Sequence, residues 1–362
     1  MKTYCGAPDR YEYLFDAELV ENIISNMSRG KAAGLDGLSA EHLQYCHPLL
    51  PGILANLFNL MILCGHVPTK FGQSYTVPIP KVNNAYNKSL TVEDFRGISI
   101  SCVLSKIFEH CILDRYRPFF VTSDNQFGFK KNSGCSHAIY TLRCAVDHYT
   151  SRGSTVNLGA LDLSKAFDKM NHYGLFIKLM EKCITKNLLI ILENWFASCL
   201  TCVKWGCTFS SFFTLTCGIR QGGVLSPYLF ALYVDGIIER IRKEYLLGCH
   251  IGWQCLSIML YADDIIIIAP SVVALEKLLL IVEHELEQLD MEINARKSMC
   301  IRIGPRFSVP CASIFTMDGR ELLWLDSVCY LGVTIISATS LTCSFTKVKQ
   351  SFYVAFNSIF GK

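Results

Sequence analysis

Residues 256–270 of this 362-residue chain read LSIMLYADDIIIIAP, and two adjacent aspartates, Asp263 and Asp264, interrupt an otherwise apolar stretch. Runs of four to eight apolar and β-branched residues bounded by turn signals are typical of buried strands. The stretch therefore predicts a tight β-hairpin with the acidic pair at its tip. A solvated Ala-Asp-Asp turn has the same composition, because aspartate is a common turn residue. This segment alone leaves both interpretations open.

A second acidic segment lies about 100 residues upstream, where residues 157–170 read NLGALDLSKAFDKM. Residues 156–163 are strand-like, with Asp162 near the end, and a helical pattern follows. A carboxylate that leaves the end of a buried strand is placed to meet the hairpin aspartates. Three such carboxylates suit two Mg²⁺ ions, with Mn²⁺ as an alternative, because these cations prefer oxygen ligands. Two ions about 3.5–4 Å apart activate an attacking oxygen and stabilise a leaving oxygen in phosphoryl transfer.

Three segments in this order resemble the palm motifs of reverse transcriptases, and most closely those of non-LTR (LINE-like) retrotransposons. They are LDLSKAFD at 161–168, GIRQGGVLSP at 218–227 and YADD at 261–264. Flanking blocks from residue 31 to residue 335 resemble the same family. The resemblance implies an RNA-directed DNA polymerase with the right-hand polymerase fold, of class α/β (α+β). Its expected partners are an RNA template, a DNA primer and dNTPs.

The resemblance also predicts how the chain is divided. We expect fingers in residues 1–155, a palm with a ferredoxin-like sheet in 156–336, and the start of a truncated thumb in 337–362. Strands and helices alternate along the palm, which predicts a sheet with helices on one face. We further expect a single helix over 225–242 and a single strand over 328–335. The chain is expected to be part of a larger polyprotein, with endonuclease and thumb regions missing here.

The resemblance assigns roles to the acidic segments. Asp162 and Asp263 are expected to hold the metal ions, Asp264 to support them, and the backbone carbonyl of Leu163 to add a ligand. Close carboxylates repel one another without metal, so at least one pKa should be raised. Lys297 resembles the lysine that protonates departing pyrophosphate, although simple attraction of phosphate accounts for it nearly as well.

Further residues resemble the nucleotide-binding positions of the family. Lys81 and Arg96 are expected to grip the triphosphate, since arginine offers phosphate a planar fork of donors and lysine a point charge. Phe167 stands at the sugar-discriminating position, Gln221 at a position that contacts the incoming nucleotide, and Gly222 would allow close backbone approach. The alternatives are an exposed ion pair for Arg96 and a phenylalanine buried under the sheet at Phe167.

Charge and the last motif bear on nucleic-acid binding. Leu331 and Gly332 resemble the primer grip, where a small residue admits the primer backbone. The net charge is only +3, but residues 65–131, which include Lys88, carry nine Lys or Arg against five acidic residues. A basic region of this kind suits a polyanion held by its backbone. Lysines on an ordinary solvated surface would give the same count.

The cysteine content indicates the cellular compartment of the chain. Eighteen cysteines without a signal peptide indicate a reducing, intracellular setting, in the nucleus, the cytoplasm or both. Cys199 and Cys202 form one C-x-x-C without a second pair at zinc spacing, which favours buried free thiols. The sequence contains no uninterrupted run of 18 apolar residues, so it predicts no membrane-spanning helix.

Two other functions fit parts of the sequence. A decayed or domesticated copy would bind RNA without polymerising, but such copies commonly lose a catalytic carboxylate, and the acidic residues are all present. A group II intron maturase shares the palm, yet it would carry a further domain after the thumb. Gly223 and Val224 stand where many relatives have a Cys-Pro-like pair. This departure affects the expected local shape of the loop and not the expected metal site.

Overall fold

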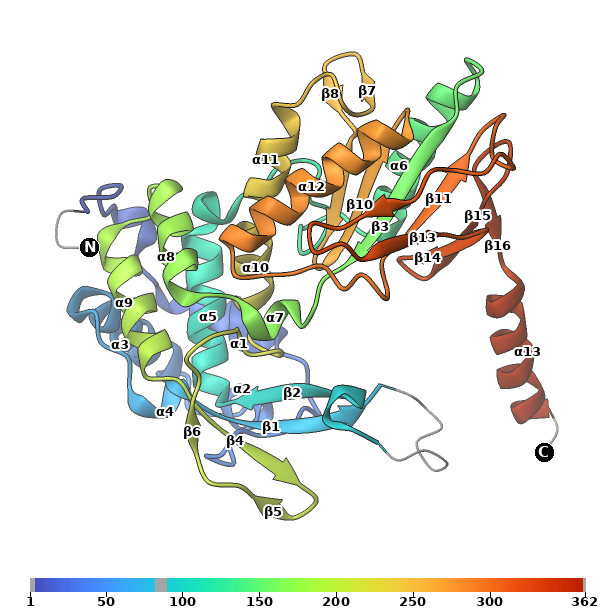
Figure 1. Cartoon of the computed structure of the whole chain (residues 1–362). Coiled ribbons are helices and arrows are strands. Elements are labelled where there is room, and N and C mark those ends of the chain that lie inside the picture. The colour runs from blue at the N-terminus through green and yellow to red at the C-terminus, as the bar shows by residue number, and fades with distance from the viewer. Residues whose placement is uncertain (1–3, 82–89, 361–362) are drawn as a thin grey trace. The chain divides into compact units, whose positions relative to one another are not determined.

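The computed structural model describes residues 4–81 and 90–360, so Lys88 of the basic region lies outside the described residues. The chain folds into two compact units that interleave along the sequence. Unit 1 comprises Met1–Val121 and Phe167–Tyr233, and unit 2 comprises Thr122–Ala166 and Val234–Lys362. The mixed α/β class expected from the sequence is confirmed (Figure 1). The division into fingers, palm and thumb stays a prediction.

Unit 1 combines a small sheet with a layer of helices. Its strands run in the order β2-β1-β4-β5, and β6 pairs with the same strand β4. The strands are β1 (Gln73–Pro80), β2 (Phe95–Ser101), β4 (Leu200–Trp205), β5 (Thr208–Phe209) and β6 (Phe213–Thr214). The helices are α1 (Ala17–Asn26), α2 (Ala40–Gln44), α3 (Leu50–Cys64), α4 (Thr69–Gly72), α5 (Val103–Arg115), α8 (His172–Glu181), α9 (Lys186–Ala197) and α10 (Ser226–Val234), with 3-10 turns at Tyr11–Tyr13, Val92–Asp94 and Arg117–Phe120.

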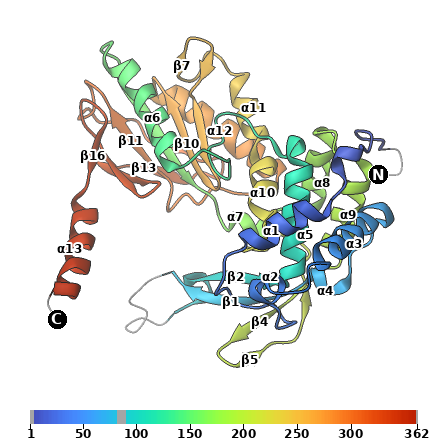
Figure 2. The ribbon, with the colours of Figure 1, turned by 180° about the vertical axis from the view of Figure 1, so that it is seen from behind.

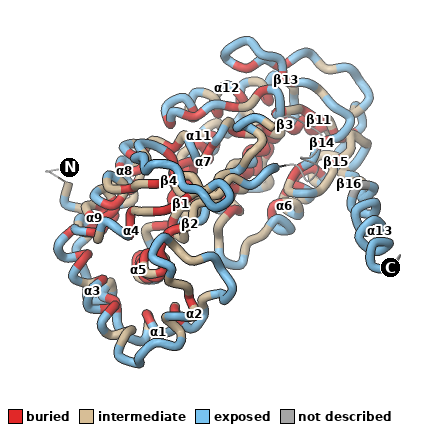
Figure 3. Tube along the Cα trace, turned by 90° about the horizontal axis from the view of Figure 1, so that it is seen from below, coloured by how far each residue is buried: buried red, intermediate tan, exposed pale blue. Residues whose placement is uncertain are grey.

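Helix α5 forms the centre of unit 1. Just over half of its residues are buried, and the red part of its trace is visible in Figure 3. Phe108 has no exposed surface, and its ring contacts those of Phe58, Phe71 and Trp195 with centroids 5.1, 6.3 and 5.5 Å apart. Aromatic pairs at such separations add stabilisation beyond the burial of their apolar area. The helix is therefore held rigidly against its neighbours.

Unit 2 is built on a six-stranded sheet in the order β12-β13-β11-β3-β10-β9. Strand β3 lies in its middle and is antiparallel to both β10 and β11. The strands are β3 (Val156–Asp162), β9 (Ile258–Tyr261), β10 (Asp264–Ala269), β11 (Met299–Ile303), β12 (Ile314–Phe315) and β13 (Glu321–Trp324), with smaller sheets from β7 (His250–Ile251), β8 (Gln254–Cys255), β14 (Ser327–Tyr330), β15 (Val333–Ile336) and β16 (Thr342–Ser344). The helices of this unit are α6 (Cys135–Thr150), α11 (Gly236–Arg242), α12 (Val272–Gln288) and α13 (Thr346–Phe360), while the short helix α7 (Ala166–Lys169) begins at the last residue of this segment and otherwise belongs to unit 1.

Helices cover both faces of this sheet, so the expectation of helices on one face was wrong. Helix α6 packs through Leu142 against a core that includes Leu158 and Ile266. Helix α12 packs on the opposite face, where a Cβ on Gly159 would contact Leu275 at 3.7 Å. Figures 1 and 2, which view the unit from opposite sides, show the two helices on opposite faces. The reason is that residues 265–268 of β10 are all buried, so both faces of the strand are apolar and need cover.

Two other element predictions were wrong. The helix expected over 225–242 breaks between α10 and α11 at Asp235, whose buried carboxylate accepts hydrogen bonds from the Ser123 backbone N–H (2.9 Å) and hydroxyl (3.1 Å). The strand expected over 328–335 is a hairpin in which Tyr330 pairs with Val333. Leu331 and Gly332 form its two-residue turn with φ values of 47° and 80°, as tight hairpin turns require.

The last element of unit 2 is helix α13, whose described side chains are all exposed (Figure 3).

Within the described ranges, no helix is both long enough and apolar enough to cross a bilayer. The buried cysteines Cys199 and Cys202 are free thiols in unit 1, as the sequence predicted.

Candidate active site

The acidic hairpin predicted from residues 256–270 is confirmed. Strands β9 and β10 are antiparallel, with Tyr261 opposite Asp264 and the turn at Ala262 and Asp263. Ala262 has a φ of 59°, and its N–H donates to Oε1 of the buried Gln126 at 3.3 Å. Asp264 is thus the first residue of a strand, whereas Asp263 belongs to the turn.

Strand β3 brings the upstream aspartate to the same place. Asp162 lies directly opposite Asp264 in the antiparallel register of β3 and β10. Directly opposed residues have Cβ atoms about 4.5–5.5 Å apart. Side chains alternate along a strand, so Asp162 shares a face with Leu158 and Asp264 shares one with Ile266. Both of those residues belong to the core beneath α6, which places the two carboxylates on one face of the sheet.

The electrostatics follow from this arrangement. Desolvation at the strand end, together with the charges of Asp263 and Asp162, raises the pKa of Asp264 to about 6. The predicted rise of at least one carboxylate pKa is confirmed. Nζ of Lys297 lies 3.6 Å from Oδ2 of Asp162, so a cation accompanies the acidic group.

Backbone contacts fix the position of Asp162. Its N–H donates to the hydroxyl of Ser298 at 3.0 Å, and its carbonyl accepts from the N–H of Asn294 at 2.7 Å. Leu163 and Ile293 form an antiparallel bridge. The hydrogen bonds of that bridge are made by the backbone groups of the residues on either side of Leu163 and Ile293, so the bridge does not use the Leu163 carbonyl. Nothing in the sequence points to Ser298, because a lone serine carries no signal.

The donor set fits a divalent cation that is completed by a substrate. Within residues 4–81 and 90–360, no three His, Cys, Asp or Glu side chains gather into a ready-made metal site. Mg²⁺ is usually held by one or two carboxylates plus substrate phosphates and water. Asp162 and Asp264 supply two carboxylates, and the pKa of Asp264 is raised first by desolvation and then by the charges of Asp263 and Asp162.

The hairpin of the predicted primer grip lies near these carboxylates in unit 2. Tyr330 is 3% exposed, and its hydroxyl has no hydrogen-bond partner among the described residues. Burial first, and then the charge of Asp264, raise the pKa of Tyr330. Leu331 packs against the same core, while a Cβ on Gly332 would meet nothing within 4 Å. The turn therefore presents an open backbone surface.

In unit 1, the predicted phosphate-binding residues share one end of the β1–β2 hairpin. Arg96 pairs with Ile79, and Lys81 follows β1 directly. Both side chains are exposed, and Nζ of Lys81 donates to the backbone carbonyl of Glu93 at 2.8 Å. The structure brings these two cations together on a solvated surface.

Phe167 is half-buried. This burial is intermediate between a ring exposed to a bound sugar and a phenylalanine fully buried under the sheet, the two interpretations of the sequence. One face of its ring stacks on Phe230 of α10 with centroids 4.4 Å apart. Its backbone carbonyl accepts from the N–H of Ile219 at 2.8 Å. The ring is therefore fixed beside the glycine-rich loop formed by residues 218–225.

The same loop carries the predicted nucleotide-contacting residue. The backbone carbonyl of Gln221 accepts from the Ser99 N–H at 2.7 Å, and its side-chain amide donates to Oδ1 of Asp168 at 3.3 Å. Gly222 has a φ of 125°, and a Cβ there would lie 2.5 Å from the Ser99 carbonyl oxygen. Only glycine fits this position, and the close approach that it permits is to strand β2.

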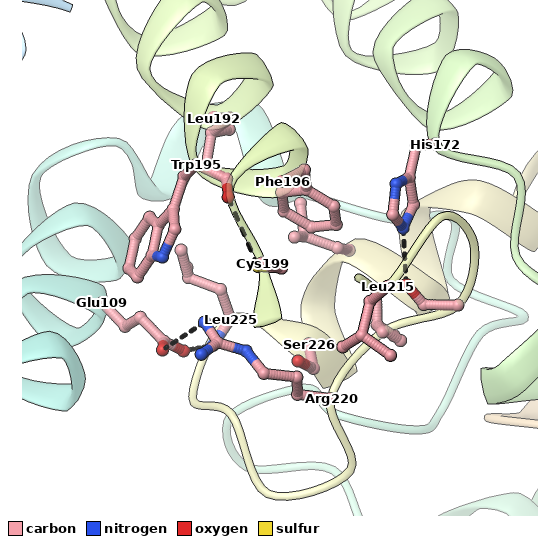
Figure 4. Close-up of a pocket in the computed structure, with 13 residues that line it drawn as sticks. Glu109, His172, Leu192, Trp195, Phe196, Cys199, Leu215, Arg220, Leu225 and Ser226 are labelled. Atoms are coloured by element: carbon pink, nitrogen blue, oxygen red, sulfur yellow. Dashed lines mark hydrogen bonds and ion pairs between the residues drawn. The ribbon is translucent and has the colours of Figure 1, made fainter. Parts of the chain in front are cut away.

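A pocket beneath this loop contains polar residues that no sequence motif predicted as site residues (Figure 4). Glu109 of α5, His172 of α8 and Arg220 of the loop supply its charged and polar groups, among apolar side chains from α9 and α10. The sequence feature that could have revealed this pocket is Glu109, an acidic residue within the apolar pattern of α5.

Comparison with known proteins shows the family of the chain. Residues 79–335 match the family described as reverse transcriptase (RNA-dependent DNA polymerase). The chain therefore belongs to the reverse transcriptase family, whose members use divalent metal ions. The resemblance inferred from the three motifs is confirmed.

The relatives come from mobile elements. The chain is 25% identical over 88% of its length to a Pol polyprotein of the type-2 retrotransposable element R2DM of Drosophila melanogaster, and covers 30% of that protein. It is 25% identical over 75% of its length to an R2 polyprotein of Popillia japonica, covering 37%. It is 23% identical over 92% of its length to the RNA-directed DNA polymerase of the mobile element jockey of Drosophila melanogaster, covering 36%. The chain thus spans about a third of these relatives.

Solved structures show the same fold. The telomerase of Candida tropicalis, truncated from its C-terminal domain, aligns with a TM-score of 0.51 at 13% identity, over 77% of this chain and 56% of that one. A second structure of this telomerase, in complex with a telomeric RNA fragment, also aligns with a TM-score of 0.51, over 82% of this chain and 48% of that one. The right-hand polymerase fold is confirmed.

Proposed function

We propose that this chain is an RNA-directed DNA polymerase domain, which adds dNTPs to the 3′-hydroxyl of a DNA primer paired with an RNA template. The observation that carries the proposal is the register that sets Asp162 opposite Asp264 in a chain of the reverse transcriptase family. Carboxylates held on adjoining strands are the ligands that a metal-assisted phosphoryl transfer needs.

The acidic residues have the central role in this proposal. Asp162, Asp263 and Asp264, with the Leu163 carbonyl, would hold two divalent ions, for which we propose Mg²⁺, with Mn²⁺ as an alternative. When bound, these ions supply activation of the attacking oxygen and stabilisation of the leaving one. Ser298 keeps the backbone of Asp162 in place. Lys297, 3.6 Å from Asp162, balances charge and is placed to attract phosphate or to give it a proton.

The residues of unit 1 would bind the nucleotide. Lys81 and Arg96 offer two exposed cations to a triphosphate. Phe167, held against Phe230, would form a wall against the sugar, which discriminates by steric contact. Gln221 would contact the incoming nucleotide from the loop that Gly222 allows to close on β2. In unit 2, Leu331 and Gly332 would receive the primer backbone.

The relatives indicate the setting of this activity. They are Pol polyproteins and polymerases of mobile elements that are about two to three times as long as this chain. We propose that the chain works as part of such a polyprotein, in the nucleus, the cytoplasm or both. Its RNA, primer and dNTP partners follow from the proposed reaction.

A primer-extension assay tests the proposal. The substrate is poly(rA)/oligo(dT) with dTTP and Mg²⁺, and the variants are Asp162→Asn and Asp264→Asn. Each should reduce incorporation by about two orders of magnitude or more, because a metal ligand is lost while shape is kept. Asp326→Asn, which changes an exposed aspartate of the same unit, is the matched control. Equal incorporation by wild type and both variants, or binding of RNA with no incorporation, would contradict the proposal.

A further inference from the structure

Glu109 is a carboxylate in the interior of unit 1. It is 3% exposed and follows the fully buried Ile107 and Phe108 in helix α5. Placing a charged group among apolar side chains is costly unless hydrogen bonds or an opposite charge compensate it. Its presence in the centre of the unit therefore points to specific partners.

The partners of Glu109 lie at the end of the glycine-rich loop. Its Oε2 accepts hydrogen bonds from the backbone N–H groups of Val224 at 2.5 Å and Leu225 at 2.8 Å. These residues directly precede α10, where backbone N–H groups lack partners within the helix and favour negative charge. Figure 4 shows the carboxylate directed from α5 towards the loop.

Arg220 of the loop completes this contact. Its Nη2 lies 3.9 Å from Oε1 of Glu109, and its Nη1 donates to the Phe71 carbonyl at 3.2 Å. The guanidinium also lies over the ring of Trp195, 5.8 Å from its centroid. Oε1 itself has no hydrogen-bond partner among the described residues, so the backbone of the loop takes the hydrogen bonds of the carboxylate.

The other end of the loop is held in a comparable way. Nε2 of the buried His172 donates to the carbonyl of Gly218 at 2.7 Å. Gln221 lies between the two ends, and its backbone carbonyl is bonded to Ser99 of β2. The loop is thus attached at its start, middle and end, while the half-buried side chain of Gln221 donates a hydrogen bond to Oδ1 of Asp168 at 3.3 Å.

We propose that Glu109 is a positioning residue for nucleotide binding, which holds Val224 and Leu225 so that the loop presents Gln221 to the incoming nucleotide. This inference rests on the proposed polymerase function. Glu109 acts through the loop and is not itself in contact with substrate.

The test compares Glu109→Met with Glu109→Gln. Methionine fills the volume but accepts no hydrogen bond, whereas the glutamine oxygen still accepts from both N–H groups. Because methionine leaves the two N–H groups without their acceptor, Glu109→Met should speed amide exchange at Val224 and Leu225 by about tenfold or more. It should raise the KM for dTTP by about tenfold with kcat changed less than about threefold. Glu109→Gln should restore both to within about threefold.

Glu283→Met is the matched control. Oε2 of this half-buried carboxylate on α12 accepts from the backbone N–H of Met317 at 2.9 Å, in unit 2. It should leave KM and the exchange of residues 224 and 225 unchanged. A rise in KM equal to that of Glu109→Met would overturn the inference, because any lost carboxylate would then have the same effect.

A double-mutant cycle with Gln221→Ala tests the route. If Glu109 acts through Gln221, the double variant should have the same KM as Gln221→Ala alone. Additive increases in KM would refute that route. Glu109→Leu repeats the comparison if the methionine variant does not fold, and failure of both to fold would show a purely structural role and overturn the inference.

Failure of the inference is distinguishable from failure of the proposed function. If the wild-type chain incorporates no dNTP, the proposed function fails, and amide exchange still shows whether Glu109 holds the loop. If exchange at Val224 and Leu225 does not respond to Glu109→Met, the inference fails whatever the activity.

Discussion

Replacing Asp264 by asparagine should stabilise the metal-free protein at neutral pH. The pKa of Asp264 is raised from 3.8 to about 6, first by desolvation and then by Asp263 and Asp162. Because the folded protein binds this proton more tightly, the stability is complete below about pH 3.8 and is lost as the pH rises through about 6. At pH 7.5 the ionised carboxylate therefore opposes folding, and asparagine removes that charge.

The size of the effect follows from the shift. Roughly two pKa units set a ceiling of about 3 kcal/mol on the free energy of unfolding. The side chain is exposed at the strand end, so screening by solvent reduces the expected gain to about 1 kcal/mol. That free energy corresponds to a rise in melting temperature of about 2–4 °C for domains of this size.

The assay is thermal unfolding in EDTA, followed by circular dichroism at pH 7.5 and pH 4. Asp264→Asn should melt higher than wild type at pH 7.5, and most of the difference should disappear at pH 4. Mg²⁺ at pH 7.5 should raise the melting temperature of wild type more than that of the variant, because the variant lacks a ligand. Asp326→Asn should behave as wild type. A lower melting temperature for Asp264→Asn at pH 7.5, or a gain independent of pH, would refute the reasoning.

Two further predictions concern stability. Gly222→Ala should destabilise unit 1 by about 1–3 kcal/mol and reduce dTTP incorporation, since the new Cβ would lie 2.5 Å from the Ser99 carbonyl oxygen at a φ of 125°. Urea unfolding measures the stability and primer extension measures the incorporation. The control is Gly206→Ala, an exposed glycine that also has a positive φ but has open space around its Cβ position, and an unchanged unfolding midpoint for Gly222→Ala would contradict the prediction. Tyr330→Phe should raise the free energy of unfolding by about 1 kcal/mol, because it removes a buried hydroxyl without a partner among the described residues; urea unfolding measures this, and a loss of stability would show that the hydroxyl has a partner in solution.

Local patterns were sufficient for most elements near the site. The apolar runs on either side of Asp263 predicted the β9–β10 hairpin, and the strand around Asp162 was also correct. Residues 328–335 were assigned to one strand because Leu331 is apolar and continues the run. The structure places a turn there, since Leu331 itself adopts a positive φ, and its composition does not reveal this.

Buried polar residues were the least predictable part. Glu109 sits in an apolar helix and Ser298 follows Lys297, and neither belongs to a recognisable motif. Their partners are backbone N–H groups more than a hundred residues away, at Val224, Leu225 and Asp162. A sequence lists side chains, whereas the need for a hydrogen bond arises only when a distant backbone is buried beside them.

The sequence by itself determined the family, the hairpin and the acidic residues, because motif order and strand patterns are local properties. Only the tertiary structure decided that Asp162 stands opposite Asp264, with Asp263 in the turn. Strand register depends on which faces are buried against α6 and α12, and a shift of one residue would turn every side chain to the other face. That long-range packing is what brings the carboxylates of two distant segments together.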